Sequence, residues 1–336
     1  MDWSDKVVLV TGGTGSFGKK FIEIMLKEYH PCKLIVFSRD ELKQHEMRAA
    51  GFDDPSLRYF IGDIRDQPRL RRAFDGVDFV VHTAALKQVP ACEYNPMEAI
   101  KTNILGSSNV IDAALDAGVK RVLALSTDKA VNPVNLYGAT KLAAEKLFVQ
   151  SNFYAGDKVT RLSCTRYGNV VGSRGSVVPV FIQQRHNGSI TITDERMTRF
   201  WISLEQGVRF VISCLEEMRG GEVFVPKIPS TAIIDLAKVV APDAQVQITG
   251  IRPGEKLHEV LISEDEARTA IELDDRYVVM PSMDLWTIGD YWRQRGQTLP
   301  DGFRYASNTN PEWLSTEQVQ AMVSSIEEAY LEGKLG

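Results

Sequence analysis

The sequence has few cysteines and no long apolar run. Its four cysteines lie far apart, without a Cys-x-x-Cys pair, which excludes a zinc ribbon and argues against a disulfide framework. Apolar stretches such as 78–82 fall far short of the about 20 residues that a membrane helix needs. The N-terminus is polar and acidic, unlike a signal peptide. We therefore expect a cytoplasmic protein with no membrane attachment and no metal site.

An excess of basic residues is also lacking. The chain has 39 Lys and Arg against 44 Asp and Glu, which gives a formal net charge of -5 at pH 7. A general nucleic-acid binder needs surplus positive charge for the phosphates, so nucleic acid is not expected as a partner. With 336 residues, of which 44% are hydrophobic and 25% charged, the chain has the composition of a globular protein and can form one large domain or two linked ones.

Short β-rich runs alternate with helical patterns through the first half of the chain. The predicted strands are 7–10, 33–37, 57–61, 78–82, 121–125 and 160–165. The predicted helices between them are 17–26, 41–50, 67–74, 97–117 and 137–154. Helical connections between strands imply right-handed crossovers and a parallel sheet. The sequence thus predicts an α/β, doubly wound Rossmann-type fold, whose ligand crevice lies at the carboxyl ends of the strands.

After residue 167 this alternation breaks down. The remaining predictions are loops at 168–172 and 225–229, strands at 189–193 and 221–225, a helix at 200–217, and a capping box at 315–318 that begins a final helix. We predict a cofactor-binding domain of residues 1–166, to which 200–225 return. Residues 167–199 and 226–336 are predicted to form a smaller, mixed C-terminal lobe that binds the substrate.

A glycine-rich loop, TGGTGSFG, occupies residues 11–18, directly after the first strand and at the start of the first helix. Glycine permits a tight turn and a close approach of the backbone to a pyrophosphate, and the helix N-terminus adds N–H groups and a positive dipole. The strand–loop–helix order favours a dinucleotide site over an ordinary Gly-rich turn. The predicted contacts are Gly12, Thr14, Gly15, Ser16, Phe17 and Gly18.

The end of the second strand distinguishes NADP from NAD. An NAD site usually has an acidic residue there for the ribose hydroxyls. This chain has Ser38 and Arg39, with Lys43 one turn on, and these residues suit a 2′-phosphate. Asp40 and Glu41 keep NAD open as the alternative, but the charges favour NADP.

Two further segments are predicted to follow the cofactor. Asp63, followed by Ile64, is placed to accept a hydrogen bond from the adenine amino group, although a helix cap is an equally ordinary role. The small residues Ala84 and Ala85 after the fourth strand allow the cofactor to pass close by.

The fifth strand and the helix after it carry the candidate catalytic residues. Tyr137 and Lys141 stand at i and i+4, on one helix face, where a neighbouring ammonium favours the phenolate and lowers the pKa of tyrosine from about 10. Tyr137 could then remove a hydroxyl proton while hydride leaves the same carbon. Thr127 can hydrogen-bond the reacting oxygen, and Asp128 and Lys129 offer an acid/base pair rather than a surface ion pair or cap.

On these motifs the chain resembles extended short-chain dehydrogenases/reductases that act on nucleotide sugars. The motifs are TGGTGSFG, GDIRD, HTAAL, STDKAVNPVNLYGATK, TRYGNVVGS, MTRFW and RPGEKLHE. Within the family, the combination SRDELKQ, STDKAVNPVNLYGATK and TDERMTRFW looks like the dehydratases that act on UDP-N-acetylglucosamine, invert C5 and begin pseudaminic acid synthesis. The resemblance implies UDP-N-acetylglucosamine as the substrate and a homodimer or larger assembly through the helices at 97–117 and 137–154. The glycan that the pathway serves, on flagellin, capsule or lipopolysaccharide, stays open.

The resemblance also implies a redox-neutral cycle on a tightly bound NADP. Tyr137, assisted by Lys141 and Thr127, would deprotonate the C4 hydroxyl as hydride leaves C4. Lys129 would then remove the C5 proton and Asp128 would protonate the departing C6 hydroxyl, before hydride returns to C6. Related dehydratases of dTDP- or GDP-hexoses carry Asp-Glu or Glu in place of the Asp-Lys pair. Membrane-bound retaining relatives carry Met at the position of Tyr137, so both residues favour the inverting type.

Substrate contacts come partly from the same resemblance. It implies that Asn169 holds the diphosphate or the sugar, and Arg199, near Met197, is placed to clamp a phosphate. Arg252 and Glu255 would take a phosphate and the ribose hydroxyls. The last predicted contacts are Thr191 and Thr193 to uracil and Lys87 to the sugar.

Two other functions are open at this point. A UDP-hexose 4-epimerase shares the glycine loop and the Tyr-x-x-x-Lys pattern, but it has no need of Asp128 and Lys129. A non-catalytic NADP-sensing protein of the same fold would typically lose the Tyr or the Lys, and this chain keeps both Tyr137 and Lys141.

Overall fold

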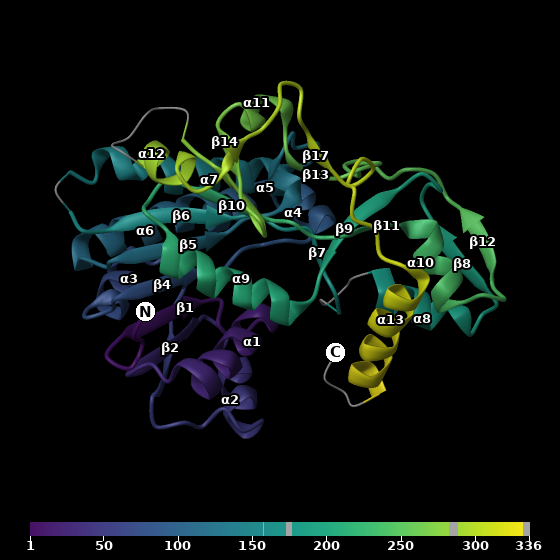
Figure 1. Cartoon of the computed structure of the whole chain (residues 1–336). Coiled ribbons are helices and arrows are strands. Elements are labelled where there is room, and N and C mark those ends of the chain that lie inside the picture. The colour runs from purple at the N-terminus through teal and green to yellow at the C-terminus, as the bar shows by residue number, and fades with distance from the viewer. Residues whose placement is uncertain (157, 173–176, 282–287, 332–336) are drawn as a thin grey trace.

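A ten-stranded sheet runs through the molecule in the computed structural model, which describes residues 1–156, 158–172, 177–281 and 288–331 (Figure 1). Its parallel strands, in spatial order, are β3 (Leu57–Ile61), β2 (Lys33–Ser38), β1 (Val7–Thr11), β4 (Phe79–His82), β5 (Arg121–Leu125), β6 (Arg161–Thr165) and β10 (Val223–Pro226). Three antiparallel strands extend the β10 edge: β15 (Arg276–Val279), β14 (Ala270–Glu272) and β16 (Gln297–Thr298). The strand order reverses between β1 and β4, which places the ligand crevice at their carboxyl ends.

Helices cover both faces of the sheet, which is why residues 8–10 of β1 and 79–81 of β4 are all apolar and buried. On one face α3 (Gln67–Phe74), α6 (Gly106–Ala117) and α7 (Leu136–Tyr154) pack side by side, and on the other α1 (Ser16–Ile24) packs against α9 (Leu204–Glu217). The other helices of this part are α2 (Glu41–Ala49), α4 (Val89–Tyr94) and α5 (Pro96–Ile100). The π-helical turns Met25–Tyr29 and Lys101–Leu105 continue α1 and join α5 to α6.

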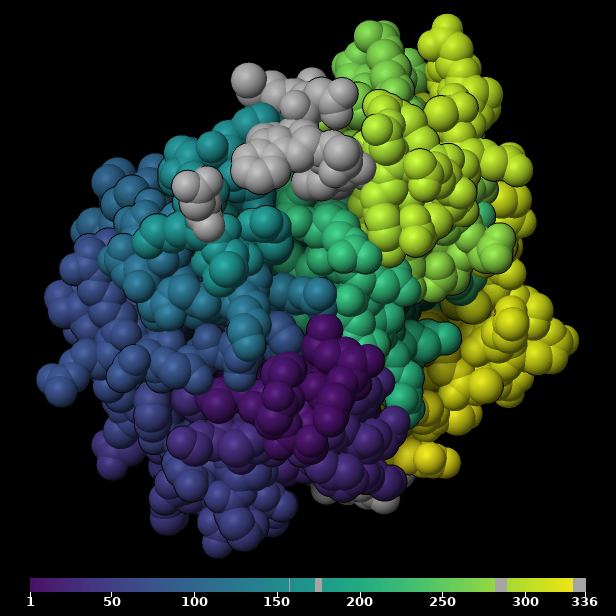
Figure 2. Space-filling view, turned by 60° about the vertical axis from the view of Figure 1, so that its left-hand side comes forward, coloured from purple at the N-terminus to yellow at the C-terminus, as the bar shows by residue number. Residues whose placement is uncertain are grey.

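A second group of elements, on the right of Figure 1, has a hydrophobic core of its own. Helices α8 (Val177–Arg185), α10 (Ile233–Val240) and α13 (Thr316–Leu331) pack on one another beside the parallel strands β8 (Ser189–Ile192) and β12 (Gln245–Ile248). Figure 2 shows the C-terminal segments gathered on one flank of the molecule. The shorter elements are β7 (Asn169–Val170), β9 (Thr198–Ile202), β11 (Ser230–Ala232), β13 (Val260–Ile262), β17 (Tyr305–Ala306), α11 (Glu264–Ala267) and α12 (Ile288–Arg293).

Most of the predicted elements are confirmed. The strands at 57–61 and 121–125 and the helix at 67–74 have the predicted bounds, and the α/β sheet has the predicted parallel order. The predicted capping box is present, since the Gln318 amide N–H donates to the Ser315 hydroxyl and the Ser315 N–H donates to the Gln318 side chain.

Predictions in the second half are partly wrong. The helix predicted at 200–217 begins only at Leu204, because its first residues belong to strand β9 and Ser203 caps the helix in a capping box. The aromatic and β-branched residues of β9 suit a strand. The loop predicted at 168–172 contains β7, and the loop predicted at 225–229 begins with the last residues of β10.

The predicted division into two domains stays a prediction. The large sheet takes β14, β15 and β16 from within the segment 226–336, so this sheet crosses the predicted boundary. Among the helices of the described residues, none has the length and apolar character that crossing a membrane requires.

Candidate active site

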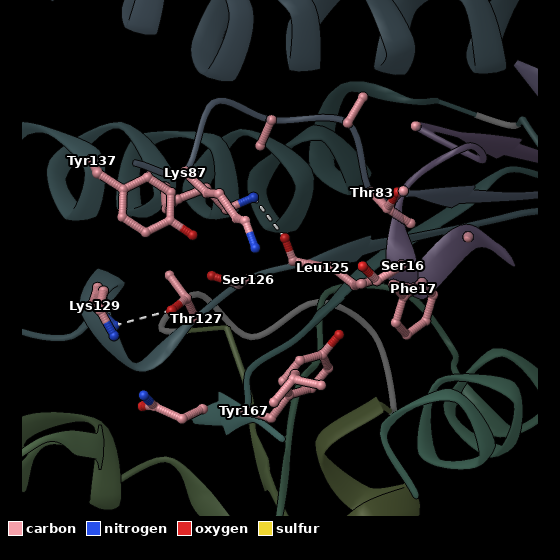
Figure 3. A pocket seen from close by; sticks show the side chains of 18 of the residues that line it. Ser16, Phe17, Thr83, Lys87, Leu125, Ser126, Thr127, Lys129, Tyr137 and Tyr167 are labelled. Atoms are coloured by element: carbon pink, nitrogen blue, oxygen red, sulfur yellow. Dashed lines mark hydrogen bonds between the residues drawn. The ribbon is translucent and has the colours of Figure 1, made fainter. Parts of the chain in front are cut away.

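A cavity of about 510 Å³ opens at the carboxyl ends of β1, β4 and β5, a volume typical of small-molecule sites (Figure 3). Figure 3 shows Tyr137 and Lys129 toward one end of the cavity and Ser16 and Phe17 toward the other. The predicted site residues that line it are Gly12, Gly15, Ser16, Phe17, Gly18, Ala84, Ala85, Lys87, Thr127, Lys129, Tyr137, Lys141 and Asn169. The cavity therefore joins the glycine loop to the candidate catalytic residues.

The glycine loop leaves backbone open to the cavity. Gly12 has a φ of +67°, and a Cβ there would lie 2.8 Å from Thr83 Oγ1. A Cβ on Gly18 would clash with the backbone of Gly13, so the helix can approach the loop only with glycine at this position. Gly15 is the N-cap of α1 and has no side chain that could bond the first N–H groups of the helix, so these groups can bind an anion.

The predicted 2′-phosphate residues lie next to the glycine loop but do not line the cavity. The Ser38 and Thr14 hydroxyls are 2.9 Å apart and buried. Arg39 is mostly exposed, with Nη1 3.9 Å from Asp63 Oδ2. Lys43 pairs with Asp40 at 3.1 Å, so the cations of this group already have acidic neighbours.

The residues predicted to contact the adenine, Asp63 and Ile64, interact with other protein groups. Asp63 accepts two hydrogen bonds from the Arg65 side chain through Oδ2, at 2.7 and 3.1 Å. Burial alone would raise the pKa of Asp63, but the hydrogen bonds from Arg65 outweigh it and lower the pKa. Ile64 is buried, and its side chain fills the space where a Cβ of Gly106 would lie. Neither Asp63 nor Ile64 lines the cavity.

Tyr137 and Lys141 come from the first turns of α7, which Asn135 caps by accepting the Gly138 N–H at 2.8 Å. Lys141 Nζ donates to the Leu125 carbonyl at the end of β5, at 2.6 Å. Burial raises the pKa of Tyr137 to about 12, against the opposing influence of Lys129. This differs from the predicted lowering, because the phenol is desolvated and Lys141 is committed to a backbone carbonyl.

Asp128 and Lys129 begin a short 3₁₀ turn, Asp128–Ala130, after β5. Asp128 is fully buried, and its Oδ1 accepts hydrogen bonds from the Thr127 hydroxyl at 2.9 Å and from Lys129 Nζ at 3.1 Å. Asp128 Oδ2 is buried and has no hydrogen-bond partner among the described residues. The acid/base pair predicted from the sequence is therefore in direct contact, with Lys129 at the cavity wall and Asp128 behind it.

Two residues beside this pair were not predicted. Glu259 Oε1 lies 3.6 Å from Lys129 Nζ, and Glu259 Oε2 lies 3.8 Å from Lys256 Nζ. Burial alone would lower the pKa of Lys129, but Asp128 and Glu259 outweigh it and raise the pKa. Both new residues belong to the RPGEKLHE motif, yet nothing in their spacing shows that the motif packs against the turn after β5.

The predicted substrate residues are only partly brought together. Asn169 lines the cavity, and its Oδ1 is buried without a hydrogen-bond partner among the described residues. The Arg199 guanidinium donates to the backbone carbonyls of Thr198, Lys256 and Leu257, at 2.7 to 3.0 Å. In this state these backbone carbonyls accept the guanidinium N–H groups that were predicted to bind a phosphate.

The other predicted substrate contacts do not line the cavity. Thr191 bonds to Gln184 in the smaller core, and the Thr193 hydroxyl lies 2.9 Å from the sulfur of buried Met197. Arg252 is exposed, 3.9 Å from Glu255, in a loop that Asn135 ties to α7 through the Gly254 carbonyl at 2.8 Å. The substrate roles of these residues stay predictions. No group of three or more His, Cys, Asp or Glu side chains suited to a metal occurs in the described part of the chain.

Known proteins resemble this chain over its length. The profile of the family described as polysaccharide biosynthesis protein matches residues 8–281. The chain is 54% identical over 332 residues to a UDP-N-acetylglucosamine 4,6-dehydratase (inverting) of Campylobacter jejuni, covering 97% of this chain and 99% of that one. It is 45% identical to a UDP-glucose 4-epimerase of Rickettsia massiliae, covering 84% of this chain and 85% of that one.

A solved structure shows the same architecture. Pen from Bacillus thuringiensis superposes with a TM-score of 0.87 at 37% identity, over 97% of this chain and 99% of that chain. The resemblance predicted from the motifs is confirmed. The chain belongs to the polysaccharide biosynthesis protein family, within which it is a full-length homologue of the inverting UDP-N-acetylglucosamine 4,6-dehydratases.

Proposed function

We propose that this protein is an NADP-containing UDP-N-acetylglucosamine 4,6-dehydratase that inverts C5. The product is UDP-2-acetamido-2,6-dideoxy-β-L-arabino-hex-4-ulose, and one water leaves. The observation that carries the proposal is the cavity that brings Thr127, Lys129, Tyr137 and Lys141 together with the glycine loop, with Asp128 directly behind Lys129. The homology to the inverting dehydratases, at 54% identity, supports the same function.

The residues present suit a nicotinamide dinucleotide. The N-terminus of α1 and the glycines at 12, 15 and 18 would hold the pyrophosphate, because a Cβ on Gly12 would lie 2.8 Å from Thr83 Oγ1 and 3.0 Å from the Ala84 backbone, so only glycine lets the loop pack this closely at the cavity. Ser38, Arg39 and Lys43 would hold the 2′-phosphate of NADP. When bound, the cofactor accepts hydride from C4 and later returns it to C6.

Tyr137 is the proposed base for the C4 hydroxyl. In this state its pKa is about 12, because the phenol is buried, so the hydroxyl is protonated near neutral pH. Positive charge added to the cavity would favour the phenolate, and Lys141 lies one turn away on the same helix. Thr127, also at the cavity wall, is placed to orient the reacting oxygen.

Asp128 and Lys129 are proposed to eliminate water across C5 and C6. Lys129 must be a neutral amine to take the C5 proton, and Asp128 must be a carboxylic acid to protonate the C6 hydroxyl as it leaves. The hydrogen bond of 3.1 Å between them means that one proton transfer from Lys129 Nζ to Asp128 Oδ1 produces both required forms. The hydroxyl then leaves as water, and Lys129 keeps the C5 proton. Once C6 has received hydride, C5 takes a solvent-derived proton on the opposite face, which inverts this carbon.

The test is incubation of the pure protein with UDP-N-acetylglucosamine in D₂O without added cofactor, followed by proton NMR of the product. We expect a 4-keto-6-deoxy sugar with deuterium at C5. The alternative is a UDP-hexose 4-epimerase, which the 45% identity to a Rickettsia protein of that name keeps in view. A C4 epimer of unchanged mass would establish the alternative, and bound cofactor without turnover would indicate a non-catalytic NADP-sensing protein.

We also propose a homodimer or larger assembly and a place at the start of pseudaminic acid synthesis, with flagellin glycosylation as its use. The exposed side chains of Met97 and Leu105, at 57% and 52%, lie in the helical stretch predicted to pair with a second copy and support the first proposal. Light scattering coupled to gel filtration tests the assembly. Deletion of the gene and analysis of the cell's glycans test the pathway.

A further inference from the structure

A buried carboxylate stands beside the proposed acid/base pair without a role in the reaction as described so far. Glu259 has a side chain that is 4% exposed. Its backbone is locked, because its N–H donates to the Ser307 hydroxyl at 3.0 Å and its carbonyl accepts the Ser307 N–H at 2.9 Å. A buried carboxylate is costly unless it is paired or hydrogen-bonded, so its position calls for a reason.

The side chain of Glu259 makes ion pairs but few hydrogen bonds. Oε1 lies 3.6 Å from Lys129 Nζ and 3.8 Å from Arg199 Nε. Oε2 lies 3.8 Å from Lys256 Nζ and has no hydrogen-bond partner among the described residues. Three cations thus surround one carboxylate, and only Lys129 of these three lines the cavity.

Among the described residues, the two other cations bond to backbone carbonyls, whereas Lys129 Nζ bonds to none. Lys256 Nζ donates to the Val131 carbonyl at 2.6 Å, and the Arg199 guanidinium donates to three carbonyls. Lys129 Nζ has Asp128 and Glu259 as its polar partners, and its side chain is 29% exposed. The ammonium that can move is therefore held by two carboxylates.

We propose, on the basis of the function proposed above, that Glu259 is a positioning residue that holds Lys129 Nζ at the cavity wall, within reach of Asp128, during the elimination step. The RPGEKLHE motif would then both bind the substrate, through Arg252 and Glu255, and position Lys129, through Glu259. Its second half packs on the turn that carries Asp128 and Lys129, through the Glu259–Lys129 and Lys256–Val131 contacts.

The charges that face Lys129 give the sign of the expected pH effect. They are the carboxylates of Asp128 and Glu259, the guanidinium of Arg199, the ammonium of Lys256 and the phenol of Tyr137. Burial alone would lower the pKa of Lys129, and the two carboxylates raise it. Replacing Glu259 by Gln removes one of them, so the pKa of Lys129 falls. An opposite charge at this distance shifts a pKa by about 1–3 units.

The test compares Glu259→Gln with the wild type in two separate steps. Oxidation at C4 is followed by the absorbance of the reduced nicotinamide, and elimination is followed by deuterium entering C5. Because Lys129 is no longer held, we expect elimination to slow by about 10- to 100-fold, the cost of misplacing a reacting group by about 1 Å. Oxidation at C4 stays within about twofold, reduced cofactor accumulates, and the acid limb of the rate profile moves to lower pH.

Glu264→Gln is the matched control, because Glu264 is an exposed carboxylate on α11 in the same part of the chain. It makes the same charge change away from the cavity and is expected to behave as the wild type. If Glu259→Gln does not fold, Glu259→Asp keeps the charge but withdraws it by one methylene, and the same split between the steps is expected with a smaller loss.

Three outcomes separate the two proposals. A wild type that forms no 4-keto sugar refutes the proposed function, and the role of Glu259 falls with it. If the wild type forms the product but Glu259→Gln matches Glu264→Gln in both steps and in pH profile, the positioning role is wrong and the function stands. Equal slowing of oxidation and elimination shows a general structural effect and also overturns the positioning role.

Discussion

Gly138 lies between Tyr137 and Lys141 on α7, and it sets how closely this helix approaches the turn after β5. A Cβ built on Gly138 would clash with the Lys129 carbonyl oxygen and would lie 3.1 Å from both the Lys129 carbonyl carbon and Pro133 Cβ. These are backbone and ring atoms that cannot rotate aside. In Gly138→Ala the helix and the turn must therefore move apart, and Tyr137 moves relative to Lys129.

The magnitude follows from two opposing effects. Overpacking of a close contact costs about 1–3 kcal/mol, whereas alanine is favoured over glycine in a helix interior by about 1 kcal/mol. We expect Gly138→Ala to lower the free energy of unfolding by up to about 2 kcal/mol on balance. Turnover should fall further, on the order of 10²-fold, because a displacement of about 1 Å between reacting groups costs that much.

Gly207 on α9 provides the matched control. Within the part of the chain that the structure describes, a Cβ there would meet only Ile202 Cδ1, at 3.9 Å, so Gly207→Ala should keep full turnover and gain up to about 1 kcal/mol of stability. Thermal unfolding and initial rates measured on both variants make the comparison. The reasoning is refuted if Gly138→Ala is as stable and as active as Gly207→Ala.

Three more predictions use other parts of the molecule. Arg39→Ala should lower the ratio of NADP to NAD in the purified protein by about 10- to 100-fold, since a hydrogen bond to a charged group contributes about 1.5–3 kcal/mol. Mass spectrometry of the released cofactor measures this ratio, and an unchanged ratio contradicts the assignment of Arg39 to the 2′-phosphate. Arg166→Met should lower the free energy of unfolding by about 3–5 kcal/mol, because it strands the carboxylates of Glu145 and Glu266 that pair with this buried guanidinium. The hydrogen bonds from Arg166 keep the pKa of Glu266 below its usual range in spite of burial. The stabilisation that this ion pair contributes is therefore present above the unfolded pKa of about 4.3 and is lost as the pH falls through the lower folded value. Denaturant unfolding at several pH values should show a shallower acid dependence in Arg166→Met, and an unchanged unfolding midpoint speaks against the reasoning. Lys129→Met should retain bound cofactor but form no 4-keto-6-deoxy sugar, and unaltered formation of that product would remove Lys129 as the C5 base.

The sheet was predictable because its signals act over a few residues. The runs at 57–61 and 121–125 are mainly apolar and have the length of a strand. The motif TGGTGSFG by itself predicts both the turn and the start of the helix. The signal weakens where two elements are separated by a single residue, as Ser203 separates β9 from α9. Thr198 and Arg199 are polar, but residues 200–202 are aromatic or apolar and fit the helical spacing of α9. The pattern therefore does not indicate a strand here, whereas pairing with β7 and β11 shows one.

The candidate site was predictable where one strand and one helix supply it, as for Lys129 and Tyr137, which are close in sequence. It was not predictable where the chain returns from far away. Lys256 bonds to Val131 and Glu259 reaches Lys129 across more than a hundred residues, and no periodicity encodes such a contact. The burial of the Tyr137 phenol also depends on tertiary packing and not on local sequence. The i, i+4 spacing suggests a lowered pKa for Tyr137, but the packed cavity wall desolvates the phenol and raises its pKa to about 12. A local pattern can therefore place a catalytic group, while the protonation state in which the group rests depends on the tertiary packing around it.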